Sequence, residues 1–296
     1  MDYAYYPGCS LESTGIEFHM STKAVAKALG INLIEIPDWN CCGATCAHSK
    51  NEKVALALPA RNIAQAEKEG KGLDIAVPCA SCYSRMKITA HAAKNSEEVR
   101  KELEDIIQMP FAAKAEVLNF LEIFSQPEVM RLCKEKMYRN LKGMKVACYY
   151  GCLTSRPAQI TGAKSTENPM EMDEIVKLTG AIPVEWDFKT ECCGASHQVD
   201  APKVARPQLD RILRNAQANG AQAIITACPL CNLNLDMREG ELNIANGTKY
   251  NLPIYQFTEL LAVCMGASAK ELGLHKHFFP AFDLLKTYLK KGGATE

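Results

Sequence analysis

The chain has 296 residues, and its 34 Lys and Arg side chains balance 34 Asp and Glu side chains to a formal net charge of zero. Such a chain carries no overall basic field that would attract nucleic acid or anionic lipid. No apolar run approaches the roughly 18–20 residues that a membrane span needs, and the first residues lack the basic and apolar regions of a signal peptide. With 47% hydrophobic residues, the chain can bury sizeable cores, and its length predicts about two domains. The lack of a signal peptide and of a membrane span predicts a cytoplasmic protein.

The first half of the chain reads as strands that alternate with helices. Short β-prone runs predict strands at Tyr3–Tyr6, Asn32–Ile36 and Asp74–Val77, each followed within a few residues by a cysteine. Helices are expected between them, over about Thr14–Leu29 and about Asn51–Glu69. This alternation favours βαβ units with parallel strands.

The second half repeats this order. Strands are expected at Lys145–Tyr149, Ile182–Trp186 and Ala223–Thr226. The cysteine-free segments Val117–Glu122 and Ile254–Glu259 also match in residue character, which supports a duplication independently of the cysteines. We therefore predict an α/β fold of two pseudo-symmetric halves, each with a small, mainly parallel sheet flanked by helices.

Outside this pattern the halves differ in length. Residues Ser155–Pro169 lengthen one loop of the second half. A tail from about Ala267 to Glu296 is largely helical in character and has no counterpart in the first half. It is expected to cap the second core or to dock a partner. We place the first domain at residues 1–140 and the second domain, with the tail, at residues 141–296.

Ten of the fourteen cysteines form the same constellation twice. Each copy has a single cysteine, an adjacent pair followed by glycine, and a C-x2-C pair. Every group falls just after a predicted strand, and the carboxyl ends of parallel strands line up along one sheet edge, so the thiols of each half are expected to converge. The first set is Cys9, Cys41, Cys42, Cys79 and Cys82, and the second set is Cys152, Cys192, Cys193, Cys228 and Cys231.

Such sets favour metal or redox chemistry over structural disulfides, because cytoplasmic thiols stay reduced. Two adjacent cysteines reach one centre only from a loop, and there they crowd a single tetrahedral ion. Zinc sites usually take four ligands, whereas each half offers five thiols. A multinuclear iron–sulfur cluster spreads its ligands over several irons. We therefore expect an iron–sulfur centre in each half, with zinc in the first half as a minor alternative.

The two complete repeats, together with residues Tyr5–Cys9, resemble the CCG-domain (cysteine-rich domain) family, and within it the B subunits of the heterodisulfide reductases of methanogens. The resemblance covers nearly the whole chain. It implies Rossmann-like halves that each bind a noncubane [4Fe–4S] cluster through the five cysteines. The implied reaction reduces the mixed disulfide of coenzyme M and coenzyme B to two thiols, with this small-molecule substrate between the two clusters.

The same resemblance implies partner subunits, because electrons need a route in and no GxGxxG motif for a flavin or nicotinamide opens a helix after a strand. The implied partners are an iron–sulfur subunit with two cubane clusters, a flavin-containing subunit, and an upstream hydrogenase or formate dehydrogenase. Two rival functions stay open. One is a CCG-family iron–sulfur subunit of a lactate, glycolate or succinate oxidoreductase that passes electrons towards a quinone. The other is a non-catalytic zinc–cysteine scaffold.

Two histidines near the CCG motifs, His48 and His197, are candidate proton donors to a departing thiolate, since imidazole titrates near neutral pH. Loop histidines bonded to the backbone are the plainer alternative. Both implied coenzymes are anionic, so basic residues near the cysteine loops are candidates to bind them. The candidates are Arg85, Arg156, Lys164 and Arg206. The alternative is that these residues are solvated surface cations. Three further cysteines are expected to be buried hydrophobes: Cys133, Cys148 and Cys264.

Overall fold

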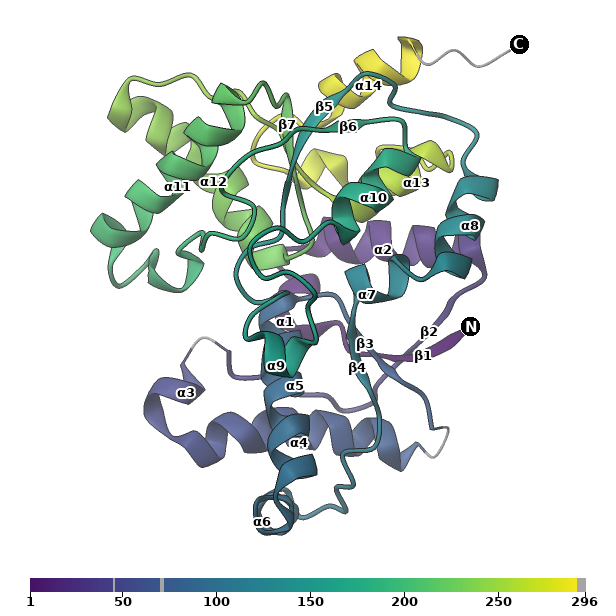
Figure 1. Cartoon of the computed structure of the whole chain (residues 1–296), viewed down its shortest axis with the longest axis vertical. Coiled ribbons are helices and arrows are strands. Elements are labelled where there is room, and N and C mark those ends of the chain that lie inside the picture. Colours follow the sequence, from purple (N-terminus) through teal and green to yellow (C-terminus); the bar gives the residue numbers. More distant parts are fainter. Residues whose placement is uncertain (45, 70–71, 292–296) are drawn as a thin grey trace.

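The computed structural model describes residues 1–44, 46–69 and 72–291 of the chain. In this part of the chain each half contributes one four-stranded sheet, and helices lie around both sheets (Figure 1). Every strand pairing in the two sheets is parallel. The predicted α/β fold of two similar halves is confirmed.

The first sheet has the strand order β2 (Asn32–Glu35), β1 (Asp2–Tyr5), β3 (Ile75–Val77) and β4 (Val117–Asn119). Its first three strands in sequence lie within a residue or two of the predicted runs, and β4 covers the start of the cysteine-free repeat. The helices around it are α1 (Gly8–Leu11), α2 (Ile16–Leu29), α3 (Ala47–Lys50), α4 (Glu52–Lys68), α5 (Ala80–Asn95), α6 (Glu97–Ile107), α7 (Phe120–Phe124) and α8 (Pro127–Lys136).

The second sheet repeats this order as β6 (Ile182–Pro183), β5 (Lys145–Tyr149), β7 (Ala223–Thr226) and β8 (Ile254–Gln256). Around it lie α9 (Ala158–Thr161), α10 (Glu171–Leu178), the 3₁₀ turn η1 (Ala195–His197), α11 (Pro202–Ala218), α12 (Pro229–Asn246), α13 (Phe257–Cys264), the 3₁₀ turn η2 (Leu274–Lys276) and α14 (Phe282–Lys291).

The two halves share a hydrophobic core. The ring of Phe257 on α13 lies edge-on to Phe18 of α2 and Phe124 of α7, with centroid distances of 6.4 and 5.4 Å. Beside them, the buried hydroxyls of Ser21 and Thr258 are hydrogen-bonded at 2.7 Å. Each half also has a buried cluster on the outer side of its sheet. The division at residue 140 stays a prediction, because the shared core joins the regions on its two sides.

The tail packs on this shared core, with Leu272, Leu274 and Leu285 buried in it. Only α14 and the short η2 are helical in the described part of the tail, so it is less helical than expected. One reason is that the carboxylate of Asp236 on α12 accepts two backbone N–H bonds from Phe278 and Phe279 and holds that stretch extended. Residues 292–296, the end of the predicted tail, lie outside the described residues.

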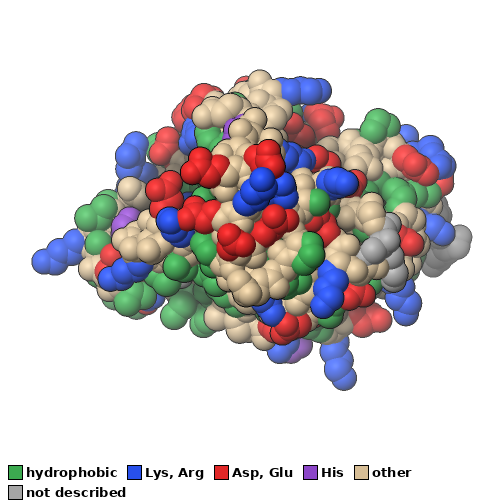
Figure 2. Space-filling view, turned by 90° about the horizontal axis from the view of Figure 1, so that it is seen from below, with side chains coloured by type: hydrophobic (Ala, Val, Ile, Leu, Met, Phe, Trp, Pro, Cys, Tyr) green, Lys and Arg blue, Asp and Glu red, His purple; other side chains and the backbone are tan. Residues whose placement is uncertain are grey.

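Figure 2 shows the face on which α6 lies, where acidic and basic side chains alternate. Ion pairs account for this mixture, among them Lys53 with Glu102, Lys101 with Glu97, and Arg100 with Glu97 and Glu104. Exposed pairs of this kind contribute little stability, and they leave no single-sign patch here. In the described part of the chain, no helix has both the length and the apolar character needed to cross a bilayer.

Candidate metal centre

The ten repeated cysteines lie where the strands end. In the first half, Cys9 lies on α1 directly after β1, and Cys79 immediately precedes α5. The adjacent pair Cys41 and Cys42 lies in the loop after β2. Because β2, β1 and β3 are adjacent and parallel, the sheet edge brings together thiols that are far apart in sequence, as predicted.

Within the first half the sulfurs approach one another in pairs. The Sγ atoms of Cys42 and Cys82 are 3.2 Å apart, and those of Cys9 and Cys41 are 3.9 Å apart. The backbone N–H of Gly43 also donates to Cys41 Sγ at 3.5 Å. The Cys82 thiol, as the nearest hydrogen-bond partner, lowers the pKa of Cys42 to about 7. Cys42 therefore ionises near neutral pH.

The second half repeats these pairs. The Sγ atoms of Cys193 and Cys231 are 3.5 Å apart, and the N–H of Gly194 donates to Cys192 Sγ at 3.3 Å. The neighbouring Cys152 thiol lowers the pKa of Cys192 to about 6. The interaction with Cys192, together with burial, raises the pKa of Cys152. Each half thus contains a thiol that is readily available as a thiolate.

The two sets meet at their buried ends. Cys79 of the first half adjoins Cys228 of the second, at the equivalent position of the repeat, and Ala80 packs in the same buried cluster as Cys228 and Cys231. This contact raises the pKa of Cys79. At the other end Cys9, Cys41 and Cys192 are exposed to solvent. The two sets therefore have buried inner ends and exposed outer ends.

Two tyrosines that were not predicted as site residues fix the loops before the adjacent cysteines. Tyr6 donates its hydroxyl hydrogen to the carbonyl of Asn40 at 2.8 Å, and Tyr149 donates to the carbonyl of Glu191 at 2.6 Å. Each tyrosine is buried and stands three residues before the single cysteine of its set. Their equal spacing from Cys9 and Cys152 was the signal that could have identified them.

The donor set fits an iron–sulfur cluster. Each half offers five thiols, and the paired sulfurs, 3.2–3.9 Å apart, are spaced much like two thiolates that share a metal at about 2.3 Å. In the described part of the chain, no group of three or more His, Cys, Asp and Glu side chains is arranged to hold a metal ion. Thiol ligands that arrive as pairs suit a centre with several metal atoms.

The predicted histidines lie in different settings. His197 on η1 is 61% exposed, its Nδ1 is 3.5 Å from Asp200 Oδ2, and its charge is among the causes that lower the pKa of Cys192. His48 lies exposed on the short helix α3, which follows Cys46. Of the two predicted histidines, His197 has the electrostatic link to a cysteine of the repeated sets.

The four predicted cations differ in their binding partners. Arg156 binds Glu167 and the carbonyl and hydroxyl of Thr190, so it supports the loop before the second CCG motif. Arg206 pairs with Glu241 at 3.2 Å. Arg85 is half-buried, and its charge contributes to the lowered pKa of a first-set thiol. Among the described residues, only Arg85 and Lys164 of the four are not paired with a carboxylate.

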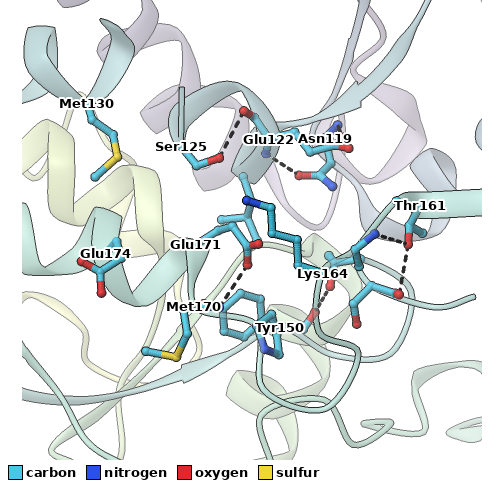
Figure 3. Close-up of a pocket in the computed structure, with 16 residues that line it drawn as sticks. Asn119, Glu122, Ser125, Met130, Tyr150, Thr161, Lys164, Met170, Glu171 and Glu174 are labelled. Carbon is cyan, nitrogen blue, oxygen red and sulfur yellow. Dashed lines mark hydrogen bonds between the residues drawn. The ribbon is translucent and has the colours of Figure 1, made fainter. Parts of the chain in front are cut away.

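A cavity of about 560 Å³ lies between the halves, walled by α7 and by the region around α9 and the start of α10. Lys164 of the lengthened loop reaches into it, and the carboxylates of Glu122 and Glu171 lie near the same space (Figure 3). Glu174 also lines it. Because carboxylates outnumber the lysine among the described lining residues, the cavity does not suit the anionic ligands considered for Lys164.

The prediction of buried, non-ligating cysteines agrees with their burial. All three are almost fully buried, and burial raises the pKa of each thiol. Cys148 lies in β5, paired with Ile225 of β7, where its side chain packs in the shared core. The residues concerned are Cys133, Cys148 and Cys264.

The fold and the site define a two-half α/β protein with one set of five thiols in each half. The model of the cysteine-rich (CCG) domain matches the chain twice, over residues 3–87 and 146–236. The chain therefore belongs to this family, and the resemblance drawn from the sequence is confirmed.

Curated relatives are subunits of oxidoreductases. The chain is 31% identical over 286 residues to the membrane anchor subunit of 8-methylmenaquinol:fumarate reductase from Wolinella succinogenes, covering 96% of this chain and 99% of that one. It is 28% identical over 286 residues to the B subunit of the ferredoxin/F420H2-dependent CoB–CoM heterodisulfide reductase of Methanosarcina acetivorans, covering 95% of this chain and 94% of that one.

A solved structure supports the fold. The chain is similar to a hypothetical protein from Helicobacter pylori with a TM-score of 0.71 at 11% identity. The match covers 94% of this chain and 51% of that one, so the chain spans about half the length of that protein.

Proposed function

We propose that this chain is the catalytic subunit of a heterodisulfide reductase, which reduces the mixed disulfide of coenzyme M and coenzyme B to two thiols. The observation that carries the proposal is the meeting of two complete five-cysteine sets at Cys79 and Cys228, where Ala80 of the first half packs in the buried cluster of Cys228 and Cys231. A disulfide takes two electrons and two protons and yields two thiols, so two equivalent redox centres that adjoin one another suit its two sulfurs. The relative in Methanosarcina acetivorans, named as the B subunit of such an enzyme, supports the same function.

The ligands would be the five cysteines of each set, holding one noncubane [4Fe–4S] cluster per half. When bound, such clusters supply one-electron transfer and iron sites open to sulfur. The chain's own residues position this chemistry. Tyr6 and Tyr149 fix the loops of the adjacent cysteines, and the buried contact between the sets excludes water from their inner ends. His197, beside Cys192, is the better placed of the two histidines to deliver a proton.

The proposed partners follow from the electron count. A small iron–sulfur subunit with two cubane clusters would deliver electrons, and a flavin-containing subunit with an upstream hydrogenase or formate dehydrogenase would supply them. The relatives are named as subunits of larger enzymes, which supports a complex of this kind. A cytoplasmic location stays part of the proposal.

A second candidate is a CCG-family subunit of a quinol-linked fumarate reductase. The 31% identity to the Wolinella succinogenes subunit, over almost the full length of both chains, favours it specifically. In that role the two cysteine sets would transfer electrons between a quinol and a partner subunit, without a disulfide substrate. This is close to the rival succinate-type function that the sequence left open.

The test is metal and sulfide analysis with EPR of the anaerobically purified protein, before and after addition of coenzyme M thiol. We expect about eight irons per chain and a paramagnetic signal that appears or changes with the thiol. Cys82→Ser and Cys231→Ser, one in each set, are each expected to lose about half of the iron.

Other outcomes separate the alternatives. Iron with no response to the thiol, but reoxidation of the reduced centres by a quinone analogue, contradicts disulfide reduction and supports the quinol-linked role. Zinc without iron, after failed reconstitution, contradicts both and leaves the zinc–cysteine scaffold.

A further inference from the structure

The two halves differ in charge at equivalent positions beside their cysteine sets. On α5, Arg85 follows Cys82 by three residues, and on α12, Asn234 follows Cys231 by three residues. Residues three apart on a helix are neighbours on its surface. Arg85 therefore lies beside the last cysteine of the first set, where the second set has an uncharged amide.

A second difference adds to the first. The residue before the adjacent cysteines is Asn40 in the first half and Glu191 in the second. These positions are structurally equivalent, because their carbonyls accept the hydroxyl hydrogens of Tyr6 and Tyr149 respectively. At the two pairs of equivalent positions, the first half thus carries one positive charge and the second half one negative charge.

The surroundings of Arg85 leave its charge available to the first set. Its side chain is half-buried, and among the described residues it makes no hydrogen bond or ion pair. A partly buried charge without a partner is unfavourable, and a thiolate of the first cysteine set would offset that cost. Cys82 Sγ is 3.2 Å from Cys42 Sγ, and the Arg85 charge is one cause of the lowered pKa of Cys42.

In the second half, nearby cations are compensated. Lys189 forms a buried ion pair with Asp173 at 2.9 Å, and the exposed His197 faces Asp200 at 3.5 Å. The amide of Asn234 donates to the carbonyl of Cys193 at 2.8 Å, which supports the loop without adding a charge. The carboxylate of Glu191 stands next to Cys192 in the chain and raises the pKa of that thiol, whereas the exposed His197 lowers it.

We propose that Arg85 and Glu191 make the two redox centres unequal, so that the centre of the first half accepts an electron more readily than that of the second. This rests on the proposed iron–sulfur clusters but not on the identity of their substrate. Reduction adds a negative charge to a centre, and a nearby cation stabilises that charge while a carboxylate opposes it. Arg85 and Glu191 act on the two centres through their charges, without contacting the substrate.

The experiment is an EPR-monitored redox titration with dithionite at pH 8, where an exposed imidazole is mostly neutral. Cys82→Ser and Cys231→Ser, which each retain one centre, assign the two midpoint potentials. We expect the higher potential in the first half. Arg85→Gln should lower the midpoint potential of the first half and leave that of the second half unchanged. Arg85→Lys keeps the positive charge and should retain most of the first-half potential.

Glu191→Gln is a second variant, at an exposed position, and it keeps the proposal testable if the Arg85→Gln protein does not fold. It should raise the potential of the second half alone. Arg206→Gln, which breaks a surface ion pair with Glu241, is the matched control and should move neither potential. Equal potentials in the unmodified protein, or potentials that respond alike to Arg85→Gln and Arg206→Gln, overturn the proposal.

The inference and the disulfide chemistry can fail separately. Unequal potentials that shift as expected in a protein that ignores coenzyme M thiol uphold the inference and contradict disulfide reduction. A response to coenzyme M thiol in a protein with equal potentials supports disulfide reduction and contradicts the inference.

Discussion

Gly8 and Gly151 occupy equivalent places against the last cysteine of each set. Both have left-handed backbone, with φ of +71° and +67°, and a Cβ atom would lie 3.2 Å from Cys82 Sγ at the first and 3.1 Å from Cys231 Sγ at the second. Gly30 has a similar φ of +69°, yet no atom lies within 4 Å of its Cβ position. Comparing these positions separates backbone strain from crowding at the thiols.

We predict that Gly8→Ala lowers the iron content of the purified protein by about half, because the added methyl group displaces Cys82. Gly30→Ala should keep its iron. Both variants are expected to lose about 1–2 kcal/mol of unfolding free energy through the strained φ. Iron analysis per chain and urea unfolding measure the two effects. The same iron content in both variants would contradict the role of Gly8.

At the level of single residues, spacing in the sequence was enough to predict where the ten cysteines gather. It was not enough to separate the other candidates. Arg156 looked like Arg85 in sequence, but Glu167 and Thr190 occupy its guanidinium. A side chain's partner depends on tertiary contacts, and those contacts decide whether a cation is available.

Among the secondary-structure elements, the cysteine-free repeat proves to be a strand that runs directly into a helix. In each half the last residue of the strand caps the helix: Asn119 before α7 and Gln256 before α13. The glutamate three residues later, Glu122 or Glu259, accepts the backbone N–H of the capping residue in return. This capping box explains why the segments match in residue character.

We predict that Asn119→Ala lowers the unfolding free energy by about 1 kcal/mol, because the N–H of Glu122 loses its acceptor. Asn119→Ser should retain most of the stability, since a serine hydroxyl also caps helices. Urea unfolding followed by circular dichroism measures the difference. If the serine variant is as unstable as the alanine variant, the contribution of Asn119 lies in its packing rather than in the cap.

The sequence predicts the ends of a helix or strand where neighbouring residues in the chain set them, but not where a tertiary contact sets them. The predicted strand Ile182–Trp186 ends after Pro183. Trp186 instead donates its indole N–H to the carbonyl of Cys148 at 3.2 Å and packs against Tyr149. That contact crosses to the neighbouring strand, and the β-propensity of five residues does not reveal it.

For the whole molecule, the sequence predicted two similar halves but not how they join. The contacts between Cys79 and Cys228 and between Phe18 and Phe257 depend on which helix faces meet. Repeat spacing carries no information about such contacts, because it records only the order of residues within each half.

The tail adds a buried ionic junction to the joined halves. The His277 side chain is 1% exposed, with Nε2 2.9 Å from Glu259 and Nδ1 3.5 Å from Asp236. Burial disfavours the charged imidazole, but the two carboxylates outweigh it and raise the pKa of His277 to about 11. Across the junction, burial and then Glu259 raise the pKa of Glu17 on α2 to about 7.

We predict that His277→Gln lowers the unfolding free energy at pH 7 by about 3–5 kcal/mol, because two buried carboxylates lose their cation. The raised pKa gives a stabilisation that is complete below the unfolded value of about 6.5 and is lost as the pH rises through about 11. The unmodified protein should therefore lose stability between pH 7 and 11, and the variant should lose less over that range. His275→Gln, an exposed neighbour, is the control. Urea unfolding at each pH measures both, and parallel pH profiles for His277→Gln and the unmodified protein would contradict the charged junction.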